Sequence, residues 1–246
     1  MINLECGWCK TVFVSEKWRH AKFCSVACGR MNRKLHVTHR FEIDNDEKFY
    51  WIGFLFGDGF VNGDANMLGI TLSNLDGGSS VRLLTDFSFY MCGKDTVKQY
   101  GNTCTFKVHD EKLCNNLSHY GIVPKKTYLS TWKNIPEEFI YPFIAGYFDA
   151  DGWFSCGKYR HISNGKYYDK PNFGICSYKK ESLDRLLPFL SDCRPRLTKK
   201  SNQELFELTV SNNNGLLTLF KKMMAYGRLD RKWTKISNYL KSRGLI

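Results

Sequence analysis

The sequence predicts an α+β protein of two similar halves, preceded by a small metal-binding module. A nine-residue motif at residues 51–59 returns at residues 144–152, an offset of 93 (144 minus 51). In each half the hydrophobic pattern switches between helical and strand periods, and four cysteines cluster ahead of both halves. At 246 residues, 43% of them hydrophobic and 24% charged, the chain has ordinary globular composition and can bury a sizeable core.

The module at residues 1–35 is defined by Cys6, Cys9, Cys24 and Cys28. Cys-x2-Cys, a gap of fourteen residues and Cys-x3-Cys match the spacing of tetrahedral zinc ligands. "KFCSVACGRMNRK" looks like the second knuckle of a zinc-ribbon or treble-clef finger that runs into a basic helix. The alternatives are a redox Cys-x-x-Cys, which has no βαβ context here, and His20 in place of one cysteine.

We expect one structural Zn²⁺ in this module, because so short a segment folds only with metal. Its many lysines and arginines suggest an accessory DNA-binding unit. Residues 36–48, "LHVTHRFEIDND" and the start of the next helix, are expected to be a linker.

The first half, residues 49–133, should run helix, two strands, helix, two strands, helix. Asn45 or Asp44 can cap the motif helix, and Gly59 is expected to end it in left-handed geometry. "FVNGD" followed by "MLGITLS" reads as a hairpin, and "VRLLTDFSFYM" has helical spacing. "TVKQYGNTCTFKV" predicts a second hairpin with its turn at residues 101–102.

The second half, residues 134–246, repeats this order. Pro142 suits the first turn of its motif helix, Gly152 is expected to end it in left-handed geometry, and "SLDRLLPFL" predicts a helix. The residues "RPRLTKKSNQELFELTV" predict a hairpin. Gly69 matches Gly174 at an offset of 105, so about twelve extra residues (105 minus 93) lie around "YRHISNGKYYDKP".

The two motif helices should bring two carboxylates together. Gly53 and Gly146 are small enough to let the helices approach closely, and Asp58 and Asp151 follow at their ends. Two close carboxylates form either a proton-sharing dyad or a divalent-metal site. Near DNA, metal ions between such carboxylates can activate water and stabilise the leaving oxygen of a phosphodiester.

Charge points to an anionic partner. The net charge is +12, the pI is about 9.2, and cations alternate with aromatics in "GKYRHISNGKYYDK", as on nucleic-acid surfaces. No apolar run reaches the roughly 18 residues of a membrane span, and the start lacks a signal-peptide pattern. We therefore expect a soluble cytoplasmic protein, with no membrane partner and with its remaining cysteines reduced.

The second motif, "IAGYFDADG", and more weakly the first, "WIGFLFGDG", resemble the signature of the LAGLIDADG homing endonucleases. The resemblance covers about residues 45–240 and is to the single-chain form. It implies two pseudo-symmetric αββαββα halves that meet through the signature helices, with saddle-shaped sheets along the DNA major groove. It also implies a monomeric, mobile-element enzyme, intron-encoded or free-standing, that cuts both strands of a long asymmetric DNA site with Mg²⁺. Mn²⁺ would substitute, and Ca²⁺ would support binding without efficient cleavage.

The resemblance assigns site residues by motif position. Asp58 and Asp151 would be catalytic and bind the metal, with Gly57 and Ala150 in the same metal site. Lys126, from "GIVPKKT", and the aligned Lys232 would be catalytic residues near the cleaved phosphates, where a lysine can polarise the water network and offset charge in the transition state. Phe56 departs from the family pattern, since it replaces the acid found at Asp149. That position is not a family metal ligand, so Asp149→Asn should harm cleavage much less than Asp151→Asn.

Because strand residues alternate between two faces, one face of each hairpin should meet DNA. The expected DNA contacts are Asn62, Lys98, Lys107, Ser155, Tyr159, Arg160, His161, Lys166, Arg194, Arg196, Lys199 and Lys200.

Two other readings remain. One is a DNA-binding regulator or RNA-splicing maturase that keeps this scaffold without cutting, although such a protein has no need of paired carboxylates. The other is an RNA-binding protein with a zinc ribbon, which leaves the duplicated Asp-Gly helices unexplained. The end of the sequence, "RGLI", lacks the His-Asn pair of a self-splicing protein, so no intein is expected.

Overall fold

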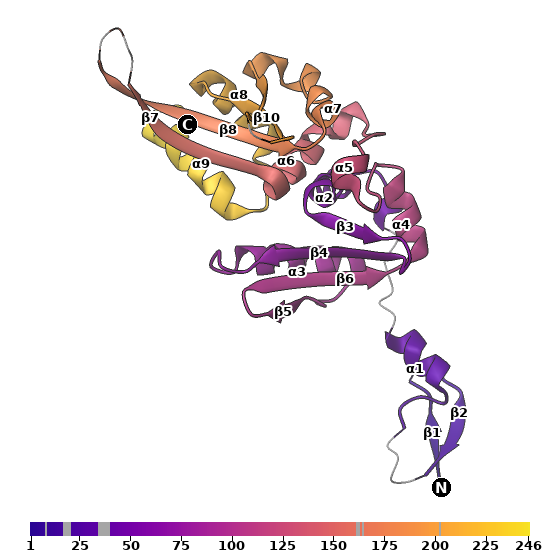
Figure 1. Cartoon of the computed structure of the whole chain (residues 1–246). Helices are drawn as coiled ribbons and strands as arrows, with labels where there is room; N and C mark the ends of the chain where they lie inside the picture. Colours follow the sequence, from indigo (N-terminus) through magenta and orange to yellow (C-terminus); the bar gives the residue numbers. More distant parts are fainter. Residues whose placement is uncertain (8, 17–20, 34–39, 161–162, 164, 202) are drawn as a thin grey trace. The chain divides into compact units, whose positions relative to one another are not determined.

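The computed structural model describes the chain except for residues 8, 17–20, 34–39, 161–162, 164 and 202, and except for the side chains of 30–33 and 40. The chain divides into two compact units, Met1–Val37 and Thr38–Ile246. Figure 1 shows the elements of both. Among the described residues, no helix combines the length and the apolar character that crossing a membrane requires.

The first unit contains a hairpin and a short helix. Strands β1 (Ile2–Glu5) and β2 (Val12–Ser15) pair antiparallel, and α1 spans Val26–Arg33. Cys6 and Cys9 therefore sit in the hairpin connection, while Cys24 and Cys28 flank the start of α1.

The first half of the second unit follows the predicted order of elements. A 3₁₀ turn, η1 (Arg40–Glu42), precedes α2, and Phe41 is buried edge-on against Tyr90, so the packed unit begins before residue 49. The elements are α2 (Asp46–Gly57), β3 (Gly59–Asn62), β4 (Met67–Ser73), α3 (Ser79–Cys92), β5 (Lys98–Tyr100), β6 (Thr103–His109), α4 (Glu111–Ser118) and α5 (Lys126–Leu129). Their strands form an antiparallel sheet in the order β3-β4-β6-β5.

The second half repeats the arrangement. Its elements are η2 (Glu137–Phe139), α6 (Ile140–Asp151), β7 (Gly152–Arg160), β8 (Tyr167–Ser177), α7 (Lys180–Asp184), η3 (Pro188–Cys193), β9 (Arg196–Lys199), β10 (Phe206–Val210), α8 (Asn213–Met223) and α9 (Asp230–Ser242). The sheet order is β7-β8-β10-β9, the same pattern as in the first half. The α+β prediction of two similar halves is confirmed.

Two details of the second half differ in length or continuity. β7 and β8 have 9 and 11 residues against 4 and 7 in β3 and β4, so the extra residues lengthen this hairpin. The helix predicted from "SLDRLLPFL" is interrupted: α7 ends at Asp184 and a 3₁₀ segment starts at Pro188. Proline lacks the N–H that would continue the helix, which accounts for the break.

The second unit is organised around α2 and α6, which are apolar and buried over most of their length. A Cβ placed on Gly53 would lie 2.0 Å from the Phe143 carbonyl oxygen, and one on Gly146 would lie 1.9 Å from the Tyr50 oxygen. The contact is therefore backbone against backbone and nearly two-fold symmetric. Asn45 caps α2 by accepting from Lys48 N at 2.8 Å, which is one of the two predicted caps.

The expectation that Gly59 and Gly152 end these helices in left-handed geometry is wrong. Gly152 is extended, with φ −86° and ψ 161°, and Gly59 is not among the residues with positive φ. At both positions glycine is required because a larger residue would overlap with neighbouring atoms. A Cβ on Gly59 would lie 2.6 Å from the Leu55 oxygen, and one on Gly152 would lie 2.1 Å from the Phe148 ring.

Candidate metal and nucleic-acid site

The ends of α2 and α6 bring Asp58 and Asp151 into one site. A Cβ on Gly57 would lie 2.3 Å from the Ala150 Cβ and 3.2 Å from Asp151 Oδ2, so the Asp151 carboxylate lies directly against the end of α2. Asp58 is half-buried, and Asp151 is exposed. The sequence-predicted residues Gly57, Asp58, Ala150 and Asp151 are thus brought together.

The electrostatics of this pair are those of a site prepared for a cation. Burial raises the pKa of Asp58 above its ordinary value, while Lys232 and Lys126 oppose the rise. Burial and then the charge of Asp58 raise the pKa of Asp151 to about 6. A divalent cation that binds between two such carboxylates offsets the repulsion between their charges. The donor set, two carboxylates with backbone carbonyls beside them, fits Mg²⁺ or Ca²⁺.

Each predicted lysine reaches the end of one motif helix. Lys126 Nζ donates to the Gly57 oxygen at 2.8 Å. Lys232 Nζ donates to the carbonyl oxygens of Phe148, Asp149, Ala150 and Gly152 at 2.8, 2.7, 3.1 and 2.6 Å. Both side chains are 7% exposed, and burial lowers the pKa of Lys126 and lowers the pKa of Lys232 to about 8.

Asp149 lies two residues before Asp151 and has a different environment. Its Oδ2 accepts from Tyr50 Oη at 2.7 Å and from the backbone N–H groups of Arg228 and Leu229 at 2.8 and 3.1 Å. Its Oδ1 accepts from Trp233 Nε1 at 2.7 Å, and the residue is 1% exposed. Burial raises the pKa of this carboxyl, and the four donors oppose the rise. Asp149 therefore ties α6 to the segment that leads into α9.

The matching place in the first half is apolar. Phe56 corresponds to Asp149, and its ring lies 6.4 Å from that of Phe143 and 5.2 Å from that of Tyr147. Phe143 in turn corresponds to Tyr50 at the offset of 93 (143 minus 50). A Tyr–Asp hydrogen bond on one side is thus replaced by a Phe–Phe contact on the other. Sequence reasoning missed Tyr50 and Trp233, although the paired exchange was visible in the aligned motifs.

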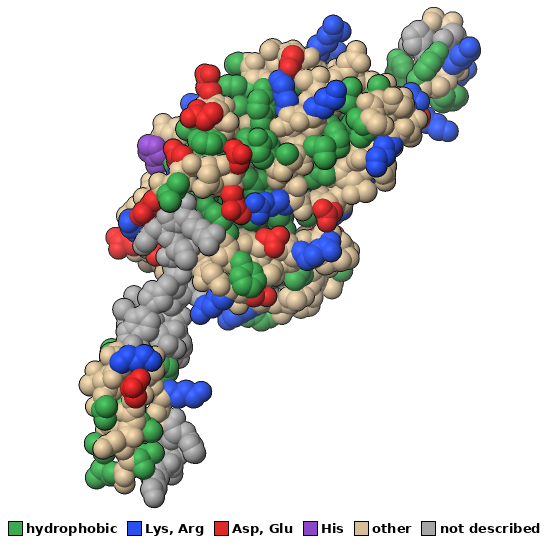
Figure 2. Space-filling model, turned by 180° about the vertical axis from the view of Figure 1, so that it is seen from behind, with side chains coloured by type: hydrophobic (Ala, Val, Ile, Leu, Met, Phe, Trp, Pro, Cys, Tyr) green, Lys and Arg blue, Asp and Glu red, His purple; other side chains and the backbone are tan. Residues whose placement is uncertain are grey.

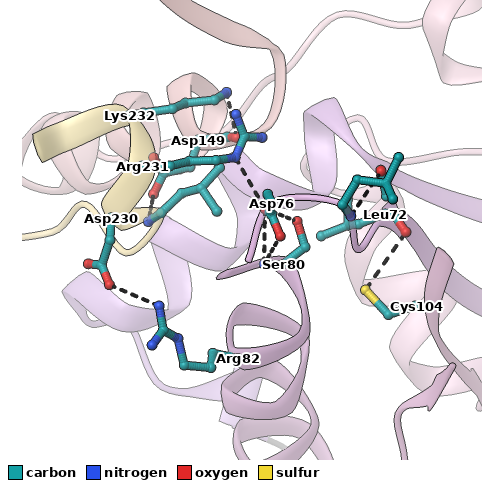
Figure 3. Close-up of polar contacts among 12 residues, drawn as sticks. Leu72, Asp76, Ser80, Arg82, Cys104, Asp149, Asp230, Arg231 and Lys232 are labelled. Atoms are coloured by element: carbon teal, nitrogen blue, oxygen red, sulfur yellow. Dashed lines mark hydrogen bonds and ion pairs between the residues drawn. The ribbon is translucent and has the colours of Figure 1, made fainter. Parts of the chain in front are cut away.

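Ion pairs join the start of α9 to the first half, as Figure 3 shows. Arg231 Nε donates to Asp76 Oδ2 at 3.2 Å, and Arg82 pairs with Asp230 at 3.5 Å. Asp76 is held in turn by Ser80, whose N–H and hydroxyl both donate to it. The residue before Lys232 is therefore bound to the first half of the second unit.

A cavity of about 130 Å³ opens beside the first lysine. Its lining includes Lys126, Asp151, Thr127, Ser130, Ser177 and Tyr147. Apolar side chains, among them Phe56 and Leu205, line the rest of the cavity, and a space of this size has room for water beside the polar groups. The cavity therefore gives solvent access to one carboxylate and one lysine of the site.

Most of the expected DNA-contacting side chains are exposed on the strands. Asn62, Lys107, Ser155, Tyr159 and Arg196 point away from the helices, as judged by their buried neighbours in each strand. Four others are exposed at strand or turn positions where buried and exposed residues do not alternate, namely Lys98, Lys166, Arg194 and Lys200. Figure 2 shows lysines and arginines interspersed with acidic and apolar side chains on the face seen from behind. His161 lies outside the described residues.

Arg160 and Lys199 lie on the other side of their strands. Arg160 has the parity of Phe154, whose ring contacts Tyr239 of α9 at 5.9 Å. Lys199 pairs in register with Phe206 and its ammonium bridges to Glu204 at 2.6 Å. Both side chains are nevertheless exposed.

The four cysteines of the first unit form a second candidate metal site. One ligand atom from each of Cys6, Cys9, Cys24 and Cys28 lies within 4.8 Å of the others, with Sγ–Sγ distances of 3.6 Å for Cys9–Cys24 and 3.4 Å for Cys24–Cys28. Tetrahedral zinc–thiolate geometry places sulfurs about 3.8 Å apart, so the donor set fits Zn²⁺. His20 lies outside the described residues.

The comparisons with known proteins concern the fold. No protein-family model matches the chain, and no curated protein does. Among solved structures, the meganuclease I-SmaMI bound to an uncleavable DNA matches with a TM-score of 0.60 and 14% identity, over 78% of this chain and 88% of that one. I-SmaMI bound to uncleaved DNA with calcium ions matches with a TM-score of 0.57, 15% identity and 82% and 93% coverage. The LAGLIDADG meganuclease I-AabMI, bound to uncleaved DNA, matches with a TM-score of 0.51, 17% identity and 81% and 92% coverage.

Proposed function

Since the chain has the LAGLIDADG fold, we propose that it is a site-specific endonuclease that cuts both strands of a DNA duplex with divalent metal ions. The observation that carries the proposal is the junction of Asp58 and Asp151 at the ends of two packed helices, with a lysine at each end. A protein that only binds DNA gains nothing from two carboxylates placed close together at the ends of packed helices.

The residues have distinct roles in this mechanism. Asp58 and Asp151 would hold the cation, which supplies activation of water and stabilisation of the leaving oxygen. A cation held there would offset the repulsion between the two carboxylates and favour their ionised forms. The buried lysine ammonium groups keep positive charge at the phosphate, where negative charge develops during cleavage.

The rest of the molecule would select and hold the duplex. The outward faces of the two sheets present amides, hydroxyls and cations in alternation, which suits contacts to base edges and phosphates. The longer β7–β8 hairpin would extend the footprint on one side of the cut. The zinc module would add sequence-independent phosphate contacts. Because one chain contains both halves that would contact the two DNA half-sites, the active species would be a monomer.

Cleavage of a library of randomised DNA sites tests the proposal. We expect cutting of both strands with Mg²⁺ and binding with little cutting with Ca²⁺. Asp58→Asn and Asp151→Asn should each reduce cleavage by orders of magnitude at saturating binding, because metal activation of water contributes several kcal/mol. Asp64→Asn, an exposed carboxylate in the β3–β4 turn, is the matched control and should cut normally. Binding with no cutting under either ion would instead identify a non-cleaving regulator or maturase.

A further inference from the structure

The two lysines of the site are equally buried but make unequal contacts. An ammonium group has three hydrogens and no acceptor. Lys232 faces four carbonyl oxygens, all within 3.1 Å, so each of its hydrogens is already engaged by the backbone. Lys126 has one carbonyl partner, the Gly57 oxygen, among the described residues.

The carbonyls around Lys232 belong to the end of α6. The last four carbonyls of a helix have no partner within the helix and carry its negative end charge. Phe148, Asp149 and Ala150 are in that last turn, and Gly152 follows it. Lys232 therefore caps α6, and its carbonyl partners lie on both sides of Asp151 in the chain.

Lys126 has two hydrogens left, and a cavity to direct them into. That cavity of about 130 Å³ is lined by Lys126 and Asp151 together with the side chains of Thr127 and Ser130. A water molecule there can meet an ammonium hydrogen, a carboxylate and a hydroxyl, the two to four polar partners that a bound water needs.

We propose that the two lysines have different functions: Lys126 is a catalytic residue that donates to water in the cavity, and Lys232 is a positioning residue that caps α6 and holds Asp151 in place. The inference rests on the proposed nuclease function, and it assigns unequal parts to two residues that the sequence aligns. The opposite arrangement, in which both lysines serve only as nearby positive charges, predicts the same effect for both substitutions.

The direction in which each substitution changes the metal affinity distinguishes these two accounts. We would measure Mn²⁺ binding to the zinc-loaded chain by electron paramagnetic resonance of the free ion, for Lys126→Met, Lys232→Met and the exposed control Lys235→Met. Removing a positive charge beside carboxylates tightens cation binding, so Lys126→Met should bind Mn²⁺ a few-fold more tightly. Lys232→Met should bind it about 10-fold or more weakly, because Asp151 is no longer held. Tighter binding by both variants would overturn the proposal.

Cleavage should show the same difference. Raising the Mg²⁺ concentration should restore cleavage by Lys232→Met to within about 10-fold of the parent, because its defect is in metal affinity. The same treatment should not restore Lys126→Met, whose defect is in turnover. Lys232→Met should also lower the melting temperature by roughly 5 °C or more, and Lys235→Met should leave it unchanged. Restoration of both lysine variants, or of neither, would contradict the assigned roles.

A measurement on the unmodified chain covers the case in which Lys232→Met does not fold. The ¹⁵Nζ signal of Lys232 should show slow exchange of its hydrogens with water, and that of Lys126 fast exchange; Lys126→Met assigns the second signal by its loss. Equal exchange rates would refute the cap. If the parent chain neither binds Mn²⁺ nor cuts DNA, the proposed function fails, while the exchange rates still decide whether Lys232 is a cap.

Discussion

Asp149→Asn should separate the stability of the fold from the chemistry of the site. The carboxylate accepts three hydrogen bonds at Oδ2 and one, from Trp233 Nε1, at Oδ1. An asparagine can keep its oxygen toward the three donors only by turning its NH₂ group toward the Trp233 N–H. One buried hydrogen bond is then lost and two donors face each other.

The expected magnitude follows from this geometry. A buried donor left without a partner costs about 1–3 kcal/mol. We take roughly 2 kcal/mol, and for a unit of this size each kcal/mol shifts the melting temperature by about 2–4 °C. The variant should therefore melt about 4–8 °C below the parent. Cleavage at saturating Mg²⁺, measured well below that transition, should fall far less than in Asp151→Asn.

Thermal unfolding followed by circular dichroism and cleavage at a fixed low temperature give both numbers. A loss of cleavage as large as that of Asp151→Asn would make Asp149 part of the chemistry and refute the separation. A shift in melting temperature below about 1 °C would show that the carboxyl is already protonated in the folded chain, since its neutral form and an amide have similar hydrogen-bonding capacity.

Three further predictions concern other parts of the chain. Gly146→Ala should leave little folded protein in a thermal unfolding assay, because its Cβ would lie 1.9 Å from the Tyr50 oxygen, a backbone atom that cannot move away; a normal transition would contradict the close helix contact. In the metal-free chain, the folded pKa of Asp151 is raised from 3.8 to about 6. The free energy of unfolding therefore decreases as pH rises through that window, because the folded chain must give up a proton that it binds more tightly than the unfolded chain does. Asp151→Asn should therefore be no less stable than the parent at pH 3.5 and more stable at pH 7, measured by denaturant unfolding, and an advantage confined to low pH would reverse the reasoning. Removing zinc with a chelator should unfold residues 1–35 by circular dichroism and leave the melting of residues 38–246 unchanged; loss of both transitions would mean that the units are not independent.

The sequence predicts the architecture well because the duplication repeats every signal. Two apolar helices that end in Asp-Gly, each followed by paired strands, define the order of elements, and the structure has that order in both halves. What it misses is local. Pro188 interrupts a segment whose apolar spacing is helical, and Gly152 serves close packing, although a glycine after a helix usually takes left-handed geometry.

Some features of the candidate site are likewise predictable from the sequence, and others are not. Asp58 and Asp151 are found by motif position, and the structure brings them together. The unequal contacts of Lys126 and Lys232 are not predictable, because the four carbonyls around Lys232 are backbone groups that every sequence has. Which strand residues face outward depends on a register that shifts all faces by a one-residue slip, and Lys199 lies on the face opposite to Arg196.

The exchange of Tyr50–Asp149 for Phe143–Phe56 also determines which halves can associate. If two copies of the first half paired, the Tyr50 hydroxyl would meet Phe56 and lose its acceptor. If two copies of the second half paired, Phe143 would meet Asp149 and the carboxylate would lose one of its donors. Each mismatch occurs twice in a symmetric dimer, and each buried polar group without its partner costs about 1–3 kcal/mol. Cut into two pieces, the chain should therefore reassemble from unlike halves, because the residues at these two aligned positions are complementary only between one half and the other.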